Sequence, residues 1–146
     1  MPIRLATRAL ILVDDRLLIV NAFPGTQSDL WCAPGGGADA HSSLPENLAR
    51  EIWEECGVAV TVGPPALINE YHSPEKRFHQ VEIFFRCTLN GPLPEEWRDT
   101  EGVVHTRRLV TRPELATLRH KPDSLAEVAW GTQSAPYDPL EPLSTP

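Results

Sequence analysis

Apolar residues form two runs near the N-terminus, separated by a short acidic interruption. Residues 5–13 are mostly aliphatic, Asp14 and Asp15 follow, and a second apolar run covers residues 17–20. Two apolar runs joined by a short polar turn are typical of a β-hairpin. We therefore expect a hairpin, then a loop over residues 23–29, a short apolar segment over residues 30–33, and a tight turn formed by Pro34-Gly35-Gly36-Gly37.

The pattern changes to a helical one after the glycines. An apolar residue recurs every fourth position, which gives one apolar stripe along a helix. The segment from Ser43 to Glu46 fits a capping box, with a proline tolerated in the first turn. Gly57 is suited to end the helix in a left-handed conformation. The stripe comprises Leu44, Leu48, Ile52 and Cys56.

The second half of the chain predicts two strands and two short helices. The strands are expected at residues 58–62 and 80–89. A second capping box begins at Thr111 and predicts a helix that runs to about Arg119, and residues 123–130 fit a third, short helix. Strands mixed with few helices indicate an α+β or α/β sandwich. Residues 134–146 hold four of the chain's 15 prolines, so we expect one domain over residues 1–133 and an extended tail outside the core.

Composition excludes several classes of protein. The chain of 146 residues has a net charge of −7, which argues against a nucleic-acid polymer or an anionic membrane as a partner. No apolar run is long enough to span a membrane, and the N-terminus lacks a signal-peptide pattern. Three widely spaced cysteines exclude a fully paired disulfide framework and favour a reducing, cytoplasmic setting. They are Cys32, Cys56 and Cys87, and we expect Cys56 to be an inert core residue.

One face of the predicted central helix carries three carboxylates. Glu51 precedes Glu54 by three residues and Glu55 by four, so they project from one side of a helix, with Arg50 beside them. Because clustered carboxylates repel one another, we expect them to converge on a divalent cation, and oxygen ligands favour Mg²⁺ or Mn²⁺. The glycine turn upstream would let a phosphate or metal approach the backbone closely. The alternative is an ordinary solvated helix face.

This arrangement resembles the Nudix hydrolase family. The family box opens here at Gly36 and closes at Val58, with Arg50-Glu51-Ile52, Glu54-Glu55 and Gly57 at matching spacing. Ser42 stands in place of the first box glutamate, and Asp39 or Glu46 could substitute for that residue in part. The wider resemblance covers about residues 5–118. It implies an α/β/α sandwich with a central mixed sheet between helices.

The resemblance also implies roles for the site residues. Glu54 and Glu55 would ligate the metal with the Gly36 carbonyl, and Glu51 would be a further ligand or the base. Arg50 would orient the carboxylates. The family often places its general base on a later loop, where Glu101 is the first candidate, and the rivals are Glu95, Glu96 and Asp99.

Substrate contacts are predicted around the glycines. Phe23 or Trp31 could stack on a base, although a core tryptophan is the commoner use, and Gly37 and Tyr71 are candidates to line the substrate mouth. Pro74 lies where the family associates a proline with ADP-ribose-type substrates, but prolines are frequent in this chain.

The implied activity is Mg²⁺- or Mn²⁺-dependent hydrolysis of a nucleoside diphosphate linked to another moiety. Candidate substrates are a nucleotide sugar such as ADP-ribose, a nucleoside triphosphate or a dinucleoside polyphosphate. Ser42 motivates an alternative, a Nudix-fold nucleotide-binding or regulatory domain with weak or no turnover. By resemblance we also expect a homodimer.

Overall fold

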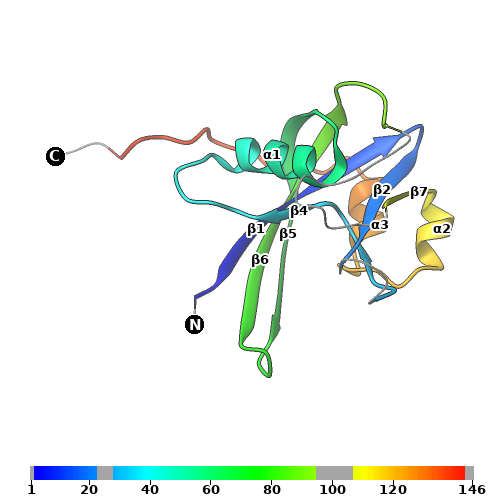
Figure 1. The fold of residues 1–146 in the computed structure, drawn as a ribbon, viewed down its shortest axis with the longest axis horizontal. Helices are drawn as coiled ribbons and strands as arrows, with labels where there is room; N and C mark the ends of the chain where they lie inside the picture. The colour runs from blue at the N-terminus through cyan, green and yellow to red at the C-terminus, as the bar shows by residue number, and fades with distance from the viewer. Residues whose placement is uncertain (1, 23–27, 95–106, 144–146) are drawn as a thin grey trace.

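The computed structural model describes residues 2–22, 28–94 and 107–143. A mixed sheet forms the centre of the molecule, and a long β-hairpin extends from one end of it (Figure 1). In chain order the elements are β1 (Arg4–Val13), β2 (Arg16–Asn21), β3 (Trp31–Cys32), β4 (Gly35–Gly37), α1 (Leu44–Cys56), β5 (Val60–Ser73), β6 (Phe78–Leu89), β7 (Arg107–Val110), α2 (Arg112–Ala116) and α3 (Leu125–Ala129).

Strand β1 lies at the centre of the sheet. The strand order is β3-β2-β1-β6-β5, with β4 paired to β1 and β7 paired to β2. β1 and β6 run parallel, with Leu5 opposite Val81, whereas the other strand pairs of the described chain are antiparallel. The predicted hairpin of β1 and β2 and the predicted mixed sheet are both confirmed.

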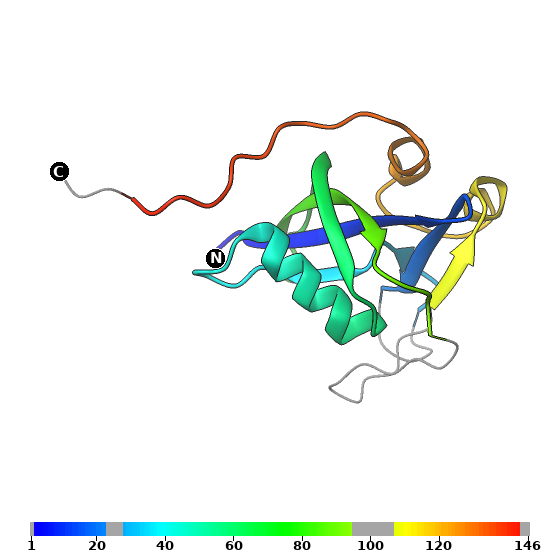
Figure 2. The same cartoon turned by 90° about the horizontal axis from the view of Figure 1, so that it is seen from above.

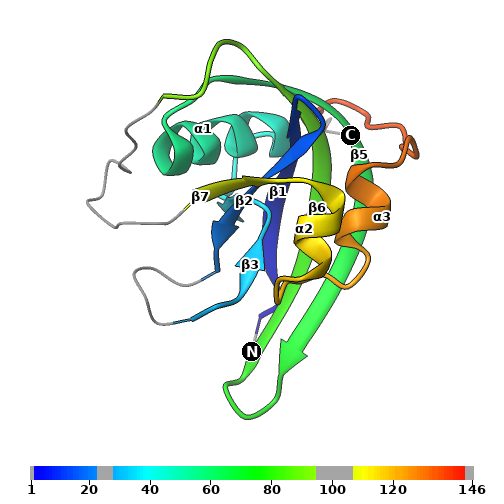
Figure 3. The same cartoon turned by 90° about the vertical axis from the view of Figure 1, so that its right-hand side faces the viewer.

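Helices cover both faces of the sheet. Side chains alternate between the two faces along each strand, and the central strands carry apolar residues on both. Ala9, Ile11 and Phe85 pack with α1 on one face. Leu10 and Phe84 pack with α2 and α3 on the other. The two helical layers lie on opposite sides of the strands (Figures 2 and 3), so the expected α/β/α sandwich is confirmed.

Helix α1 begins and ends where its sequence predicts, with the serine bond of the expected capping box. The Ser43 hydroxyl accepts the Glu46 N–H at 3.2 Å, Pro45 lies in the first turn, and Gly57 ends the helix with φ at 67°. The predicted stripe packs against the sheet, and Leu48, Ile52 and Cys56 are fully buried. The helix is therefore fixed against β1 and β5, and its opposite, carboxylate-bearing face remains available.

Four elements differ from the prediction. The glycines expected to form a turn form β4, β5 runs on to Ser73 instead of stopping at residue 62, and β7 was not expected. The continuation of β5 through Pro64 and Pro65 is possible because register shifts interrupt its pairing there, and because β6 is its one partner strand among the described residues. Helix α2 ends at Ala116, short of Arg119.

The C-terminal tail is extended, as expected, but part of it packs on the core. The Ala135 N–H donates to the Pro65 carbonyl at 2.8 Å, and Arg86 donates to the Gln133 carbonyl. The Tyr137 ring meets Phe85 edge-on, with 5.8 Å between centroids. The prediction that the tail lies outside the core is therefore wrong at Tyr137.

None of the helices in the described ranges is both long enough and apolar enough to span a membrane.

Candidate active site

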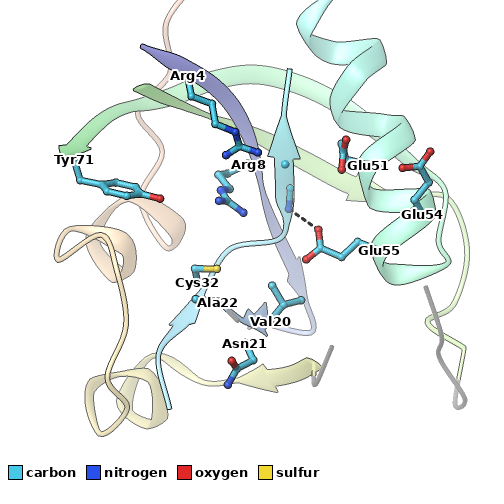
Figure 4. A pocket seen from close by; sticks show the side chains of 12 residues that line it. Arg4, Arg8, Val20, Asn21, Ala22, Cys32, Glu51, Glu54, Glu55 and Tyr71 are labelled. Carbon is cyan, nitrogen blue, oxygen red and sulfur yellow. Dashed lines mark hydrogen bonds between the residues drawn. The ribbon is translucent and has the colours of Figure 1, made fainter. Parts of the chain in front are cut away.

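The pocket of interest lies where the sheet divides. One edge of β1 pairs first with β4, where Thr7 faces Gly36, and further along with β2, where Leu12 faces Leu17. The pocket has a volume of about 390 Å³ (Figure 4). Residues from α1, β1, β2, β3, β4 and β5 contribute to its lining, and they are Arg4, Arg8, Val20, Asn21, Ala22, Cys32, Gly35, Gly36, Glu51, Glu54, Glu55 and Tyr71.

The glycines of β4 bring the backbone against the carboxylates of α1. A Cβ atom on Gly36 would lie 2.5 Å from Glu51 Oε2. The Gly35 N–H donates to Glu55 Oε2 at 3.1 Å, drawn as the dashed line in Figure 4. Gly35 also has φ at +152°, and a Cβ there would overlap the Thr7 carbonyl oxygen of β1. Gly35 therefore requires glycine, whereas a side chain at Gly36 would displace the end of the Glu51 side chain.

The three predicted carboxylates, on Glu51, Glu54 and Glu55, line this one pocket. Arg50 lies between two of them, with Nη2 3.5 Å from Glu51 Oε1 and Nε 3.8 Å from Glu54 Oε1. Burial raises the pKa of Glu51, and the charge of Glu54 raises it further. The arrangement concentrates negative charge at the mouth of the pocket, and one arginine offsets it in part.

These side chains do not gather around a single point. Among the described residues, no group of three or more His, Cys, Asp or Glu side chains could hold a metal ion as placed. The expectation that the three carboxylates converge is therefore not met. Glu55 accepts the Gly35 N–H, whereas Glu51 and Glu54 lie beside the Arg50 guanidinium. Their oxygens still fit a hard divalent cation in chemical type and in sharing one pocket. A cation would compete with Arg50 and the Gly35 N–H for them.

A buried asparagine, which the sequence analysis missed, links α1 to β4 and to the loop that follows β4. Asn47 is fully buried on α1. Its Nδ2 donates to the Gly37 carbonyl at 3.3 Å, and its Oδ1 accepts the Asp39 N–H at 3.0 Å and Arg50 Nη2 at 2.8 Å. A polar residue beside the apolar stripe, one turn before Arg50, was the available signal. Asn47 therefore fixes β4 and the following loop to the helix.

Asp39 is bonded to the box arginine. Its Oδ2 accepts Arg50 Nη2 at 2.7 Å. Asp39 and Glu46 were considered as partial replacements for the glutamate missing at Ser42. The side chain of Asp39 contacts the box arginine, whereas the Glu46 N–H caps α1. Asp39 supports Arg50 from the loop side.

The wall opposite the carboxylates carries two arginines, which the sequence analysis also missed. Arg8 Nε donates to Glu82 Oε2 at 2.7 Å, and both side chains are largely buried. Glu82 Oε1 in turn accepts Asn69 Nδ2 at 3.2 Å. This pair joins β1 to β6, which are far apart in sequence, so spacing alone could not reveal it. The only local signal was that two arginines, Arg4 and Arg8, occur in a mostly apolar strand.

The remaining predicted site residues fall into three groups. Tyr71 lines the pocket, and Gly37 lines an adjoining pocket together with Gly36 and Glu51. Trp31 packs on the α2–α3 core, with the Arg108 guanidinium 5.4 Å from its ring centroid, so its role in stacking stays a prediction. Outside the described residues lie Phe23, Glu95, Glu96, Asp99 and Glu101.

The three cysteines are free thiols. Burial raises the pKa of Cys56 to about 12 and that of Cys87 to about 12. Burial also raises the pKa of Cys32, which lines the pocket, to about 11. Thiols with such values stay protonated near neutral pH and are poor nucleophiles, which agrees with the expectation of an inert Cys56.

Comparison with known proteins identifies the family. The family model described as the NUDIX domain matches residues 2–130. The chain belongs to the NUDIX family. Its NUDIX fold is shared with a MutT NUDIX hydrolase from Burkholderia pseudomallei, with a TM-score of 0.72, 22% identity, and coverage of 88% of this chain and 98% of that one. An ADP-ribose pyrophosphatase from Streptococcus suis matches with a TM-score of 0.60 and 23% identity, over 90% of this chain and 84% of that one.

A curated relative is more similar in sequence but considerably longer. Diphosphoinositol polyphosphate phosphohydrolase 3-alpha from Mus musculus is 27% identical over 94 residues, which is 64% of this chain and 54% of the relative. This NUDIX chain thus spans about half the length of these curated relatives.

Proposed function

We propose that this chain is a metal-dependent hydrolase that cleaves a diphosphate bond in a small, nucleotide-type molecule. The observation that carries the proposal is the placement of Glu51, Glu54 and Glu55 in one pocket beside the glycine strand. Membership of the NUDIX family supports it. Carboxylate oxygens at a pocket with exposed backbone are suited to bind Mg²⁺ or Mn²⁺ and a phosphorylated ligand together.

The cation and the chain's own residues would have separate roles in this reaction. A divalent cation bound there would offset the charge of the diphosphate and activate a water molecule. Glu54, Glu55 and the Gly36 carbonyl would hold that cation. Glu51 is either a further ligand of that cation or the group that accepts a proton from the attacking water. Arg50 holds the carboxylates of Glu51 and Glu54 in place.

Two predicted contributors need separate testing. Glu101 remains the proposed general base on the later loop, and Phe23 remains a proposed base-stacking residue. Both are judged by the effect of Glu101→Gln and Phe23→Ala on kcat and KM. Loss of kcat identifies the base, whereas a raised KM at constant kcat identifies a substrate contact.

The experiment is a hydrolysis screen of the purified chain with Mg²⁺ and with Mn²⁺. The panel contains ADP-ribose, nucleotide sugars, nucleoside triphosphates, dinucleoside polyphosphates and a diphosphoinositol polyphosphate, with release of AMP or phosphate as the readout. We expect turnover of at least one member. We expect Glu54→Gln to lower kcat by at least about 100-fold, because it removes a charge from the metal site. Failure of the whole panel with both metals would contradict the proposal.

A second candidate function is a nucleotide-binding or regulatory domain with weak or no turnover. Ser42 favours it, because the first glutamate of the box is absent. This alternative expects nucleotide binding by calorimetry without product. The variant Ser42→Glu separates the two candidates. A large gain in rate indicates that Ser42 has weakened an ancestral enzyme, as the second candidate expects. An unchanged high rate supports the hydrolase and indicates that Asp39 already supports Arg50 sufficiently.

A cytoplasmic homodimer is also part of the proposal. Light scattering of the purified chain tests the oligomeric state, and a purely monomeric species would contradict the dimer.

A further inference from the structure

The wall of the pocket opposite the carboxylates contains a second, basic contact region. Arg4 lines both the main pocket and the adjoining one next to Gly36, Gly37 and Glu51. In Figure 4 its guanidinium lies across β4 from the three glutamates. The region is thus close to the proposed diphosphate site and separate from it.

The position of Arg4 is built into the fold. A Cβ atom on Gly37 would lie 2.7 Å from Arg4 Nη2, so glycine at that position leaves room for the guanidinium. Arg4 Nη1 donates to Oε1 of Gln80, a side chain that is fully buried on β6. The other end of the same amide, Nε2 of Gln80, donates to the Tyr71 hydroxyl at 3.0 Å. One buried amide therefore holds Arg4 and Tyr71 side by side at the pocket.

Arg4 differs from the other arginine of this wall in its charge balance. Arg8 is paired with the Glu82 carboxylate. No ion pair between described residues involves Arg4, whose hydrogen-bond partner is the neutral amide of Gln80. A guanidinium has five N–H donors, so four remain after the bond to Gln80.

The hydrogen-bonding capacity of this region is one-sided. Arg4 has only donors to offer. Burial raises the pKa of Tyr71, with a further contribution from Glu82, so its hydroxyl keeps its proton near neutral pH. Because that hydroxyl oxygen already accepts from Gln80, its proton is available to a ligand. A site that presents donors alone, one of them charged, matches a group rich in acceptors and negative charge, and an arginine fork matches phosphate in particular.

We propose that Arg4 and Tyr71 form a subsite for a phosphate group of the substrate that is distinct from the diphosphate being cleaved. Gln80 acts as the positioning residue. This inference rests on the proposed function for the location of the diphosphate. It narrows the substrate class to diphosphate compounds that carry an additional phosphate ester.

The test uses substrate pairs that differ by a single phosphate. NADPH and NADH share a diphosphate, as do coenzyme A and dephospho-coenzyme A, and in each pair only the first carries an additional phosphate ester. With the full chain, we expect a KM about 10- to 100-fold lower for the phosphorylated member of at least one pair, the range typical of a charged hydrogen-bonding contact. In Arg4→Gln that KM ratio should fall close to one, and Arg4→Lys should restore part of it.

Two further variants separate positioning from general damage. Gln80→Met is similar in volume but lacks both hydrogen bonds, so the KM ratio should fall in the same direction as in Arg4→Gln. Arg112→Gln removes an exposed arginine at the start of α2, and it should leave the ratio as in the wild type. Loss of folding in Gln80→Met does not affect the result from Arg4, which is exposed.

Calorimetric binding of the same pairs in EDTA distinguishes failure of the subsite from failure of the proposed function. Turnover with the same KM ratio in the wild type and in Arg4→Gln, for both pairs, would overturn the subsite and leave the hydrolase proposal standing. Tighter binding of the phosphorylated members that depends on Arg4, without any turnover, would support the subsite and overturn the hydrolase proposal.

Discussion

The charge of Glu51, which suits the proposed metal site, lowers the stability of the metal-free protein near neutral pH. Glu51 is half-buried between Gly36 and Glu54, and these surroundings raise its pKa above the ordinary value of 4.5. Between that ordinary value and the raised one, the folded protein binds more protons than the unfolded chain. Stability therefore falls as pH rises through this window, and the deficit persists at neutral pH.

Replacing Glu51 by glutamine should accordingly stabilise the metal-free protein at pH 7. The glutamine carries no charge, so the gain in melting temperature should shrink as pH falls from the raised pKa toward 4.5, and it should vanish below about 4.5. Thermal unfolding in EDTA between pH 4 and 8 measures it. Glu75→Gln, at the turn between β5 and β6, serves as the control. A variant less stable than the wild type at pH 7 would contradict this account of Glu51.

Residues whose partners are local could be predicted, and those with distant partners could not. The shared face of Glu51, Glu54 and Glu55 follows from helical spacing alone. The rotation of Glu55 toward Gly35 could not be predicted, because it depends on where β4 lies. The Arg8–Glu82 pair spans 74 positions and depends on the register of two parallel strands.

Strand β4 shows how an element forms without support from its own side chains. Glycine weakens a strand because it loses more backbone entropy on folding and offers nothing to pack. β4 forms nevertheless, because β1 offers a free edge and Asn47 holds the Gly37 carbonyl. The turn expected from three glycines was therefore wrong for a tertiary reason that local sequence does not contain.

Two adjacent glycines of β4 should respond differently to alanine. A methyl on Gly36 meets only the flexible end of Glu51, so Gly36→Ala should change stability little and lower kcat by displacing that carboxylate. A methyl on Gly35 meets the β1 backbone at a positive φ, so Gly35→Ala should cost about 1–3 kcal/mol of unfolding free energy. Urea unfolding and kcat distinguish them, and equal stability losses would contradict the assignment.

Among the elements, α1 was predictable and the length of β5 was not. The cap at Ser43, the apolar stripe and Gly57 all indicate the same helix, and the structure has that helix. In β5 the sequence Gly63-Pro64-Pro65 indicates an end to the strand. The strand continues because pairing with β6 resumes after the register shifts and outweighs the local preference.

At the scale of the whole molecule, the tail stabilises the region around β5 and β6. Tyr137 contacts Phe85, and the backbone of residues 133–135 bonds to Arg86 and Pro65. These contacts cover the place where the register of β5 shifts. The tail is thus part of the folded unit up to Tyr137.

Truncation should reveal where the contribution of the tail ends. A chain ending at Asp138 keeps Tyr137 and should melt close to the full-length chain. A chain ending at Gln133 loses an aromatic pair worth about 1 kcal/mol and should melt roughly 2–4 °C lower. Differential scanning calorimetry measures both, and equal melting temperatures would show that Tyr137 contributes nothing.

The central position of β1 has a consequence for how the chain matures. Its parallel neighbour β6 is separated from it by more than sixty residues in sequence, and closing so long a loop is slow. During synthesis β1 is translated well before β6, so the edge of β1 that pairs with β6 stays unpaired until β6 has been translated. Substitutions that delay this late pairing should therefore lower the yield of soluble protein more than they lower the stability of the finished molecule.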